Sequence, residues 1–346
     1  MRVAQRMVTR NYMRSLNTAL GKRADSLERS GSGVKYKRLS DNVADGTRAM
    51  RIQEEREQSE SALENVENIL LEYNSFDSTM KSIDDSIQTI QEKVLKAMSE
   101  SYGQGNQDVL AKEIGNIRDQ IIQFANAQFA SKHLFGGTNN ATPAFDIDAG
   151  GKATFNGIPM ELIYRDAATG EYRYDDGSGD KPVPNCENVY MDIGLGMKMT
   201  AQGPDPRTAF QVSFDSLMML GHGAPATGDK YGTPVSNNIL DLLTQLEQAV
   251  SASDKEAIDD CQGQLVRLND KMRMSRTDLG TRVTYLERTQ DRLTNDINNL
   301  GEMESSLISA DPAEEAINMK MMEYVWLATL QLGMQILPSS LLDFLR

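Results

Sequence analysis

The feature that most constrains this chain is a long apolar seam between Val66 and Ala97. Its apolar residues recur in steps that alternate between three and four: Val66, Ile69, Tyr73, Phe76, Met80, Ile83, Ile87, Ile90, Val94 and Ala97. This is the heptad a/d pattern, which places one apolar stripe along a helix and requires a second helix to cover it. The seam therefore predicts either a coiled-coil rod or the spine of a helical bundle.

A second seam in the C-terminal half can supply the covering helix. Its apolar positions run from Ile258 to Leu307, with one four-plus-four step near Leu279 and Val283 that locally relaxes a supercoil. A homodimeric coiled coil would suit one isolated seam, but two seams can pair within one chain. We therefore expect a mainly α fold, in which the N- and C-terminal halves form an elongated antiparallel helical bundle or coiled coil.

Between the seams the composition changes sharply. Residues 137–234 contain eight of the ten prolines and 14 of the 26 glycines. The β-like runs there are Ala153–Phe155, Ile158–Tyr164, Tyr172–Tyr174, Val189–Ile193 and the alternating Phe210, Val212 and Phe214. Asn156-Gly157 predicts a two-residue hairpin turn between the first two runs. This region predicts a small β-rich domain at the far end of the bundle.

The two terminal segments each lack a partner of their own. Residues 1–38 have only a narrow apolar stripe that stops at Ser30-Gly31-Ser32-Gly33, so their helix is marginal in isolation. Asp311-Pro312 begins a last helix, with Asp311 as its cap. From Ile317 onward that helix is apolar on almost every face and must be buried on every face, either in a globular core or against other subunits. We favour other subunits and expect both segments to be disordered in the free chain.

These patterns divide the chain into three parts. Residues 1–40 and 310–346 are the terminal assembly segments, residues 41–145 and 235–309 the helical rod domain, and residues 146–234 the β-rich outer domain. The residues expected to bind partners are Met13, Leu16, Leu20, Leu27, Ile317, Met321, Val325, Trp326, Leu330, Leu341, Leu342 and Phe344.

Charge is distributed unevenly along the chain, whose net charge is −14. Residues 1–40 hold ten Lys or Arg against Asp25 and Glu28, a balance of +8, which leaves −22 on the remainder. A basic arm could bind nucleic acid or an anionic membrane, but no recognised binding motif accompanies it. The simpler interpretation is that the arm meets acidic parts of its own assembly.

The sequence offers little support for catalysis, a metal site or a cofactor. The two cysteines, Cys186 and Cys261, form no CxxC pair, and the two histidines, His133 and His222, belong to no HExxH motif. The first twenty residues contain four arginines and no secretory apolar core. The best membrane-span candidate, Tyr324–Leu337, is 14 residues long, short of the ~20 that a bilayer requires. We expect no enzyme, no cofactor and no membrane insertion.

Several short runs, taken in order, resemble the flagellin superfamily and, within it, the hook–filament junction proteins. They are Met1-Arg2-Val3, Asn11-Tyr12-Met13-Arg14, Ser30-Gly31-Ser32-Gly33, Leu39-Ser40-Asp41-Asn42-Val43-Ala44, Leu134-Phe135-Gly136-Gly137-Thr138, Pro143-Ala144-Phe145, Leu279-Gly280, Ser309-Ala310-Asp311 and Leu341-Leu342-Asp343-Phe344-Leu345. Asn42-Val43 departs from the commoner Asp-Pro of this superfamily. The resemblance covers roughly residues 1–145 and 235–346, because the β-rich insert varies among these proteins.

The resemblance implies a structural adaptor of the bacterial flagellum that joins the hook, through a neighbouring junction protein, to the flagellin filament. It implies type III export without a cleaved signal, an extracellular location, copies arranged in a ring, and an export chaperone on the C-terminal segment before secretion. The nearest alternative is a flagellin, the filament subunit itself. A second alternative is a coiled-coil protein that binds nucleic acid or a membrane surface through the basic arm.

Overall fold

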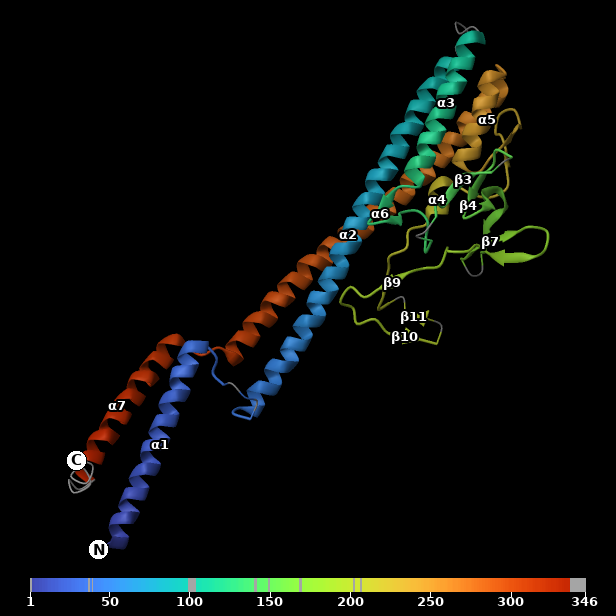
Figure 1. Ribbon diagram of the computed structural model, residues 1–346. Helices are drawn as coiled ribbons and strands as arrows, with labels where there is room; N and C mark the ends of the chain where they lie inside the picture. Colours follow the sequence, from blue (N-terminus) through green and yellow to red (C-terminus); the bar gives the residue numbers. More distant parts are fainter. Residues whose placement is uncertain are drawn as a thin grey trace. The chain divides into compact units, whose positions relative to one another are not determined.

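The computed structural model describes residues 2–36, 38, 40–98, 104–139, 142–148, 150–167, 170–201, 203–205 and 207–336 (Figure 1). The helices are α1 (Arg2–Ser32), α2 (Val43–Ala97), α3 (Gln104–Ala125), α4 (Ser216–Leu220), α5 (Ile239–Ser251), α6 (Lys255–Ile308) and α7 (Pro312–Ile336). The chain forms two compact units. Unit 1 contains the residues up to Glu60 and from Thr294 onward, and unit 2 contains Ser61–Leu293. The three-part division by function stays a prediction.

The first seam forms the centre of unit 2, as predicted. All ten of its residues, from Val66 to Ala97 on α2, are at most 2% exposed. On α6 the second seam is equally buried between Ile258 and Leu293, except for Val283, which is half-buried. The four-plus-four step turns Val283 partly out of the stripe, and the seam continues at Leu286.

The two seam helices run antiparallel within the same chain. Arg273 Nε lies 3.2 Å from an Asp84 carboxyl oxygen, and Arg276 Nε lies 2.6 Å from one of Asp77. Positions therefore rise along α6 as they fall along α2. In unit 1 the same order continues, because Arg56 of α2 pairs with Glu304 of α6 at 2.8 Å. The intramolecular pairing predicted from the two seams is confirmed.

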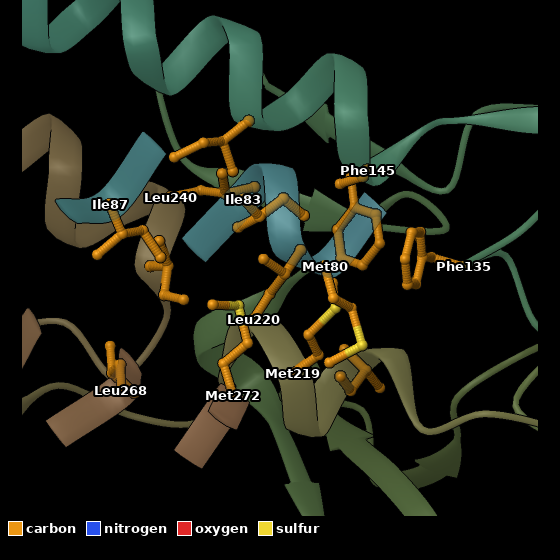
Figure 2. Close-up of a cluster of buried hydrophobic side chains, with 14 of the residues drawn as sticks. Met80, Ile83, Ile87, Phe135, Phe145, Met219, Leu220, Leu240, Leu268 and Met272 are labelled. Carbon is orange, nitrogen blue, oxygen red and sulfur yellow. The ribbon is translucent and has the colours of Figure 1, made fainter. Parts of the chain in front are cut away.

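Helices α3 and α5 complete the bundle of unit 2. Arg118 of α3 donates to Glu247 of α5 at 2.9 Å and to Thr244 at 3.2 Å. The side chain of Asn238 caps α5 by accepting a hydrogen bond from the backbone N–H of Asp241. Figure 2 shows the core, to which α2, α4, α5 and α6 contribute Met80, Ile83, Ile87, Met219, Leu220, Leu240, Leu268 and Met272.

The β-rich region consists of short antiparallel ladders. Its strands, with the preceding hairpin β1–β2, are β1 (Gln128–Phe129), β2 (Lys132–His133), β3 (Phe145–Ile147), β4 (Ala153–Phe155), β5 (Ile158–Pro159), β6 (Ile163–Arg165), β7 (Tyr172–Asp175), β8 (Asp180–Pro182), β9 (Tyr190–Met191), β10 (Met199–Thr200), β11 (Gly203–Pro204), β12 (Phe210–Gln211), β13 (Ala226–Thr227) and β14 (Pro234–Val235). Strands β3-β4-β5 and β6-β7-β8 form three-stranded sheets, and the others pair as β1-β2, β9-β12, β10-β11 and β13-β14.

The sequence predicted one turn correctly and three strands too long. Only Tyr190–Met191 of the predicted strand Val189–Ile193, and only Phe210–Gln211 of the run through Phe214, form strands. Asn156 and Gly157, at φ 49° and 81°, form the expected two-residue turn, with Phe155 opposite Ile158. The predicted strand Ile158–Tyr164 is instead interrupted by a 3-10 turn at Met160–Leu162. Met160 is fully buried, and its carbonyl accepts a hydrogen bond from Gly223 N at 3.0 Å, so the chain turns inward there.

The Phe-Gly-Gly run at 135–137 anchors the exit from the bundle. The ring of Phe76 on α2 lies 5.0 Å from the Phe135 ring, edge to face, and 5.2 Å from the Phe214 ring. Gly137 has φ 65°, and a Cβ there would overlap the Asn185 carbonyl oxygen. This turn therefore requires glycine both for its conformation and for its space.

Candidate assembly surface

The terminal helices α1 and α7 pack side by side and antiparallel in unit 1 (Figure 1). Tyr12 lies against Gly333, the Arg23 guanidinium lies 4.6 Å from the centre of the Trp326 ring, and Arg29 Nε lies 3.5 Å from Glu315. A Cβ at position 333 would overlap the Tyr12 ring, so glycine permits this close approach. The two predicted binding segments therefore partly cover each other.

The C-terminal end of α1 and the N-terminal end of α7 lie at the positions predicted from local sequence signals. Helix α1 ends at Ser32, and Gly33 follows with φ 69°. Helix α7 begins at Pro312, and the Asp311 carboxylate accepts a hydrogen bond from Ala313 N at 2.8 Å. Both boundaries confirm the predictions from the Ser-Gly run and from Asp311-Pro312.

The two segments that lead into α1 and α7 also bind each other. Lys35 N donates to Ile308 O at 2.8 Å, and Ala310 N donates to Gly33 O at 2.8 Å, which makes an antiparallel bridge between Val34 and Ser309. The Lys35 ammonium group reaches Ser306 O at 2.8 Å. These bonds join the ends of α1 and α6 and hold the start of α7 beside them.

The pair leaves exposed most of the predicted binding residues that the structure describes. Six of them are between 42% and 64% exposed: Met13, Leu20, Leu27, Ile317, Met321 and Val325. Leu16, Trp326 and Leu330 are half-buried in the pair. Leu341, Leu342 and Phe344 lie outside the described residues. The assignment of these residues to partner binding stays a prediction.

Other exposed apolar side chains on the same pair were not singled out from the sequence. They are Met7, Val8, Tyr324, Leu327, Leu332 and Met334, between 44% and 76% exposed. The available signal was the apolar character of α7 on all its faces. Since one neighbouring helix can cover only one side of α7, the residues on its other sides were also candidates. We call all exposed apolar residues of α1 and α7 the assembly surface.

Unit 2 holds titratable groups that the structure uses for packing. The Tyr172 hydroxyl donates to the Asp215 carboxylate at 2.6 Å, and the same carboxylate caps α4 through Met218 N. Burial lowers the pKa of His222 and raises the pKa of the Cys186 thiol to about 12. Burial also raises the pKa of Cys261 to about 11. Both thiols are therefore protonated and weakly nucleophilic near neutral pH.

No three His, Cys, Asp or Glu side chains gather as metal ligands within the described residues. Across the same residues, no helix has the length and apolar character needed to traverse a bilayer.

Comparison with known proteins gives a similar fold and no close relative. No family model and no curated protein matches the sequence. A solved structure from Vibrio parahaemolyticus, described as a flagellar hook-associated protein, matches with a TM-score of 0.53 at 17% identity, over 78% of this chain and 100% of that one. A flagellar hook-associated protein-3 from Legionella pneumophila gives 0.49 at 13% identity, over 75% and 98% of the two chains. The FlgL protein of Bacillus cereus gives 0.48 at 15% identity, over 74% and 99%.

The Vibrio structure alone exceeds a TM-score of 0.5 among these three, so the fold assignment rests on it. At 17% identity the match shows a similar fold and does not show a shared function. It supports the architecture implied by the sequence resemblance, because that chain is covered completely. This chain has the fold of the Vibrio flagellar hook-associated protein.

Proposed function

We propose that this chain is a non-enzymatic structural subunit of the bacterial flagellum. It acts as an adaptor that joins the hook, through a neighbouring junction protein, to the flagellin filament. The observation that carries the proposal is the assembly surface: two paired helices expose a dozen or so apolar side chains in a chain with a hook-associated fold. Exposed apolar surface of this extent on a helix pair is typical of a subunit whose partners are missing.

Incorporation would bury the assembly surface against neighbouring subunits. Leu27 is 59% exposed and Ile317 is 64% exposed, so covering either side chain would contribute about 1 kcal/mol. Any ordering of the terminal segments on binding would oppose this gain. The summed contribution of many such residues favours assembly while each single contact stays weak.

The proposed partners follow from this role. They are the adjacent hook–filament junction protein, flagellin, and further copies of the chain arranged in a ring. Before secretion, an export chaperone would cover the apolar C-terminal segment. The proposed location is extracellular, on the flagellum, after type III export without a cleaved signal.

The test replaces exposed apolar residues that the helix pair itself does not need. Leu27→Ser with Ile317→Ser should leave the helix content and the Tm of the purified chain unchanged, because both side chains already face solvent. In cells whose own gene is deleted, this variant should leave hooks without filaments and flagellin monomers in the medium. The matched control is Val109→Ser with Met274→Ser, 57% and 69% exposed in unit 2, which should restore filaments. Normal filaments on the Leu27/Ile317 variant would contradict the proposal.

A flagellin role remains the nearest alternative and has a direct test. Purified flagellin extends filament seeds into long filaments, whereas an adaptor should add to a seed without continued growth. Elongation measured by electron microscopy with seeds and the purified chain separates the two. Long filaments made from this chain alone would favour the flagellin alternative.

A further inference from the structure

Unit 1 carries charges of opposite sign in two separate segments. The basic segment, residues 2–14 of α1, holds four arginines at four-residue spacing and no acidic residue: Arg2, Arg6, Arg10 and Arg14. The acidic segment, residues 294–319, holds six acidic residues and no basic residue: Asp296, Glu302, Glu304, Asp311, Glu314 and Glu315. These positive and negative charges therefore lie in separate parts of the sequence.

The basic segment has no acidic neighbour on the helix it packs against. Arg10 and Arg14 are exposed and take part in no ion pair among the described residues. Tyr12 lies against Gly333, so these arginines lie beside the part of α7 from 324 to 336, which contains no Asp, Glu, Lys or Arg. Nothing on α7 near them neutralises their charge.

The acidic segment lies too far along the helix pair to contact Arg10 or Arg14 of the same chain. Its Glu315 pairs with Arg29, which follows Arg14 by 15 residues, or about 22 Å of helix. The Debye length at physiological salt is only about 8 Å, so exposed charges at this distance are screened from one another. An intramolecular contact between the two segments is excluded while α1 is helical.

The acidic segment also contains exposed carboxylates that form no ion pair among the described residues. Glu304 and Glu315 pair with Arg56 and Arg29, but Glu302 and Glu314 are exposed and form no ion pair among the residues described. Glu314 has an exposed apolar neighbour on the same side of its helix, Ile317 at 64%, three residues further on. The basic segment has the same combination, because Arg10 lies between Met7 at 65% and Met13 at 48%.

We propose that the basic segment of one copy docks on the acidic segment of a second copy, head to tail. The proposal rests on the proposed function, because it names the contact that would link neighbouring copies in the assembly. The two surfaces differ, so the contact is heterologous and can continue around a ring. A second copy suits this surface better than nucleic acid or an anionic membrane, because those polyanions would meet a chain whose remainder carries −22.

The direct test is a zero-length crosslink between copies. Arg10→Lys with Arg14→Lys keeps the charge and supplies amines that a carbodiimide joins to carboxylates. Unlabelled and nitrogen-15-labelled full-length copies are mixed in equal amounts, and the crosslinked peptides are identified by mass spectrometry. We expect mixed-label crosslinks from position 10 or 14 to Glu302 or Glu314 at low salt, and about fivefold fewer at high salt. Crosslinks only within one chain, or only to carboxylates outside residues 294–319, would overturn the proposal.

A charge exchange tests the same contact without crosslinking. Arg10→Glu with Arg14→Glu should lower the association constant about fivefold in sedimentation velocity, and adding Glu302→Arg with Glu314→Arg in the same chain should restore it. The control, Lys81→Glu with Lys112→Glu, makes the same change in net charge at exposed residues of unit 2 and should leave association unchanged. If the variant with all four substitutions does not regain the wild-type association constant, the pairing is refuted.

Two outcomes separate this inference from the proposed function. Crosslinks at the expected positions in a chain that never enters flagella would leave the docking intact and refute the adaptor role. A chain that enters flagella but gives no such crosslinks would refute the docking alone. Binding of the chain to phosphatidylserine vesicles, lost in the Arg10→Glu/Arg14→Glu variant and without crosslinks between copies, would assign the basic segment to membranes instead.

Discussion

Tyr73 provides the sharpest test of how the seam holds the β-rich region. It is the one seam residue with a polar end, it is fully buried on α2, and its hydroxyl donates to Val212 O at 3.0 Å. Tyr73→Phe keeps the ring and leaves that buried carbonyl without its donor. A lost buried hydrogen bond of this kind costs about 1.5 kcal/mol, which for a unit of this size lowers Tm by about 3–6 °C.

The assay is differential scanning calorimetry of the purified full-length chain. Tyr285→Phe is the matched control, because Tyr285 is 45% exposed, its ring stacks 6.0 Å from Phe210, and its hydroxyl forms no hydrogen bond with the residues that the structure describes. That control should leave Tm within about 1 °C of wild type, as expected for an exposed substitution. Equal Tm values for wild type and Tyr73→Phe would refute the reasoning that this hydroxyl ties the β-rich region to α2.

Three further predictions concern other parts of the chain. Gly137→Ala should destabilise unit 2 by at least about 2 kcal/mol in urea unfolding, whereas Gly157→Ala, with open space at its Cβ, should cost about 1 kcal/mol. Gly333→Leu should displace Tyr12 and loosen α1 from α7, which the fluorescence of the single tryptophan, Trp326, reports as a shift toward longer wavelength. Hydrogen bonds from the Thr233 hydroxyl and nearby backbone N–H groups hold the pKa of Asp260 well below its usual range. This carboxylate therefore stabilises the fold above the unfolded-state pKa of about 3.9, and the stabilisation is lost as the pH falls toward the folded-state pKa. The free energy of unfolding of Asp260→Asn, measured against pH, should therefore fall less at acid pH than that of the wild type.

The elements predicted correctly share one property: short-range pattern decides them. The seam from Val66 to Ala97 repeats every three or four residues, so its buried face follows from spacing alone. Asn156-Gly157 and Asp311-Pro312 form their turn and cap with neighbours one or two positions away. The second seam then identified the covering helix, which removed the need for a homodimer.

The features that the sequence did not predict depend on contacts between distant residues. Met160 leaves the strand pattern because it is buried beside Gly223, more than sixty positions away. Asp260 receives hydrogen bonds from residues 230–233, which the heptad pattern of α6 does not indicate. Helix α4 was missed because a five-residue helix has no measurable periodicity.

The assembly surface was predicted only in part for a related reason. Which sides of α7 are covered depends on where α1 lies, and α1 covers a narrow strip through Tyr12, Arg23 and Arg29. The apolar pattern of α7 indicates that it needs partners. It does not indicate which of its residues remain for them after α1 has docked.

Hydroxyl-radical footprinting of free and assembled chains tests the central claim most directly. Met7, Tyr324 and Met334 are 65%, 71% and 76% exposed, so all three should oxidise readily in the purified chain. In intact hook–filament preparations their oxidation should fall about tenfold or more, as expected for side chains moved into a packed interface, while Met274 of unit 2, 69% exposed, serves as the reference. Equal oxidation of all three residues in the free and the assembled chain would contradict the claim that this surface binds neighbouring subunits.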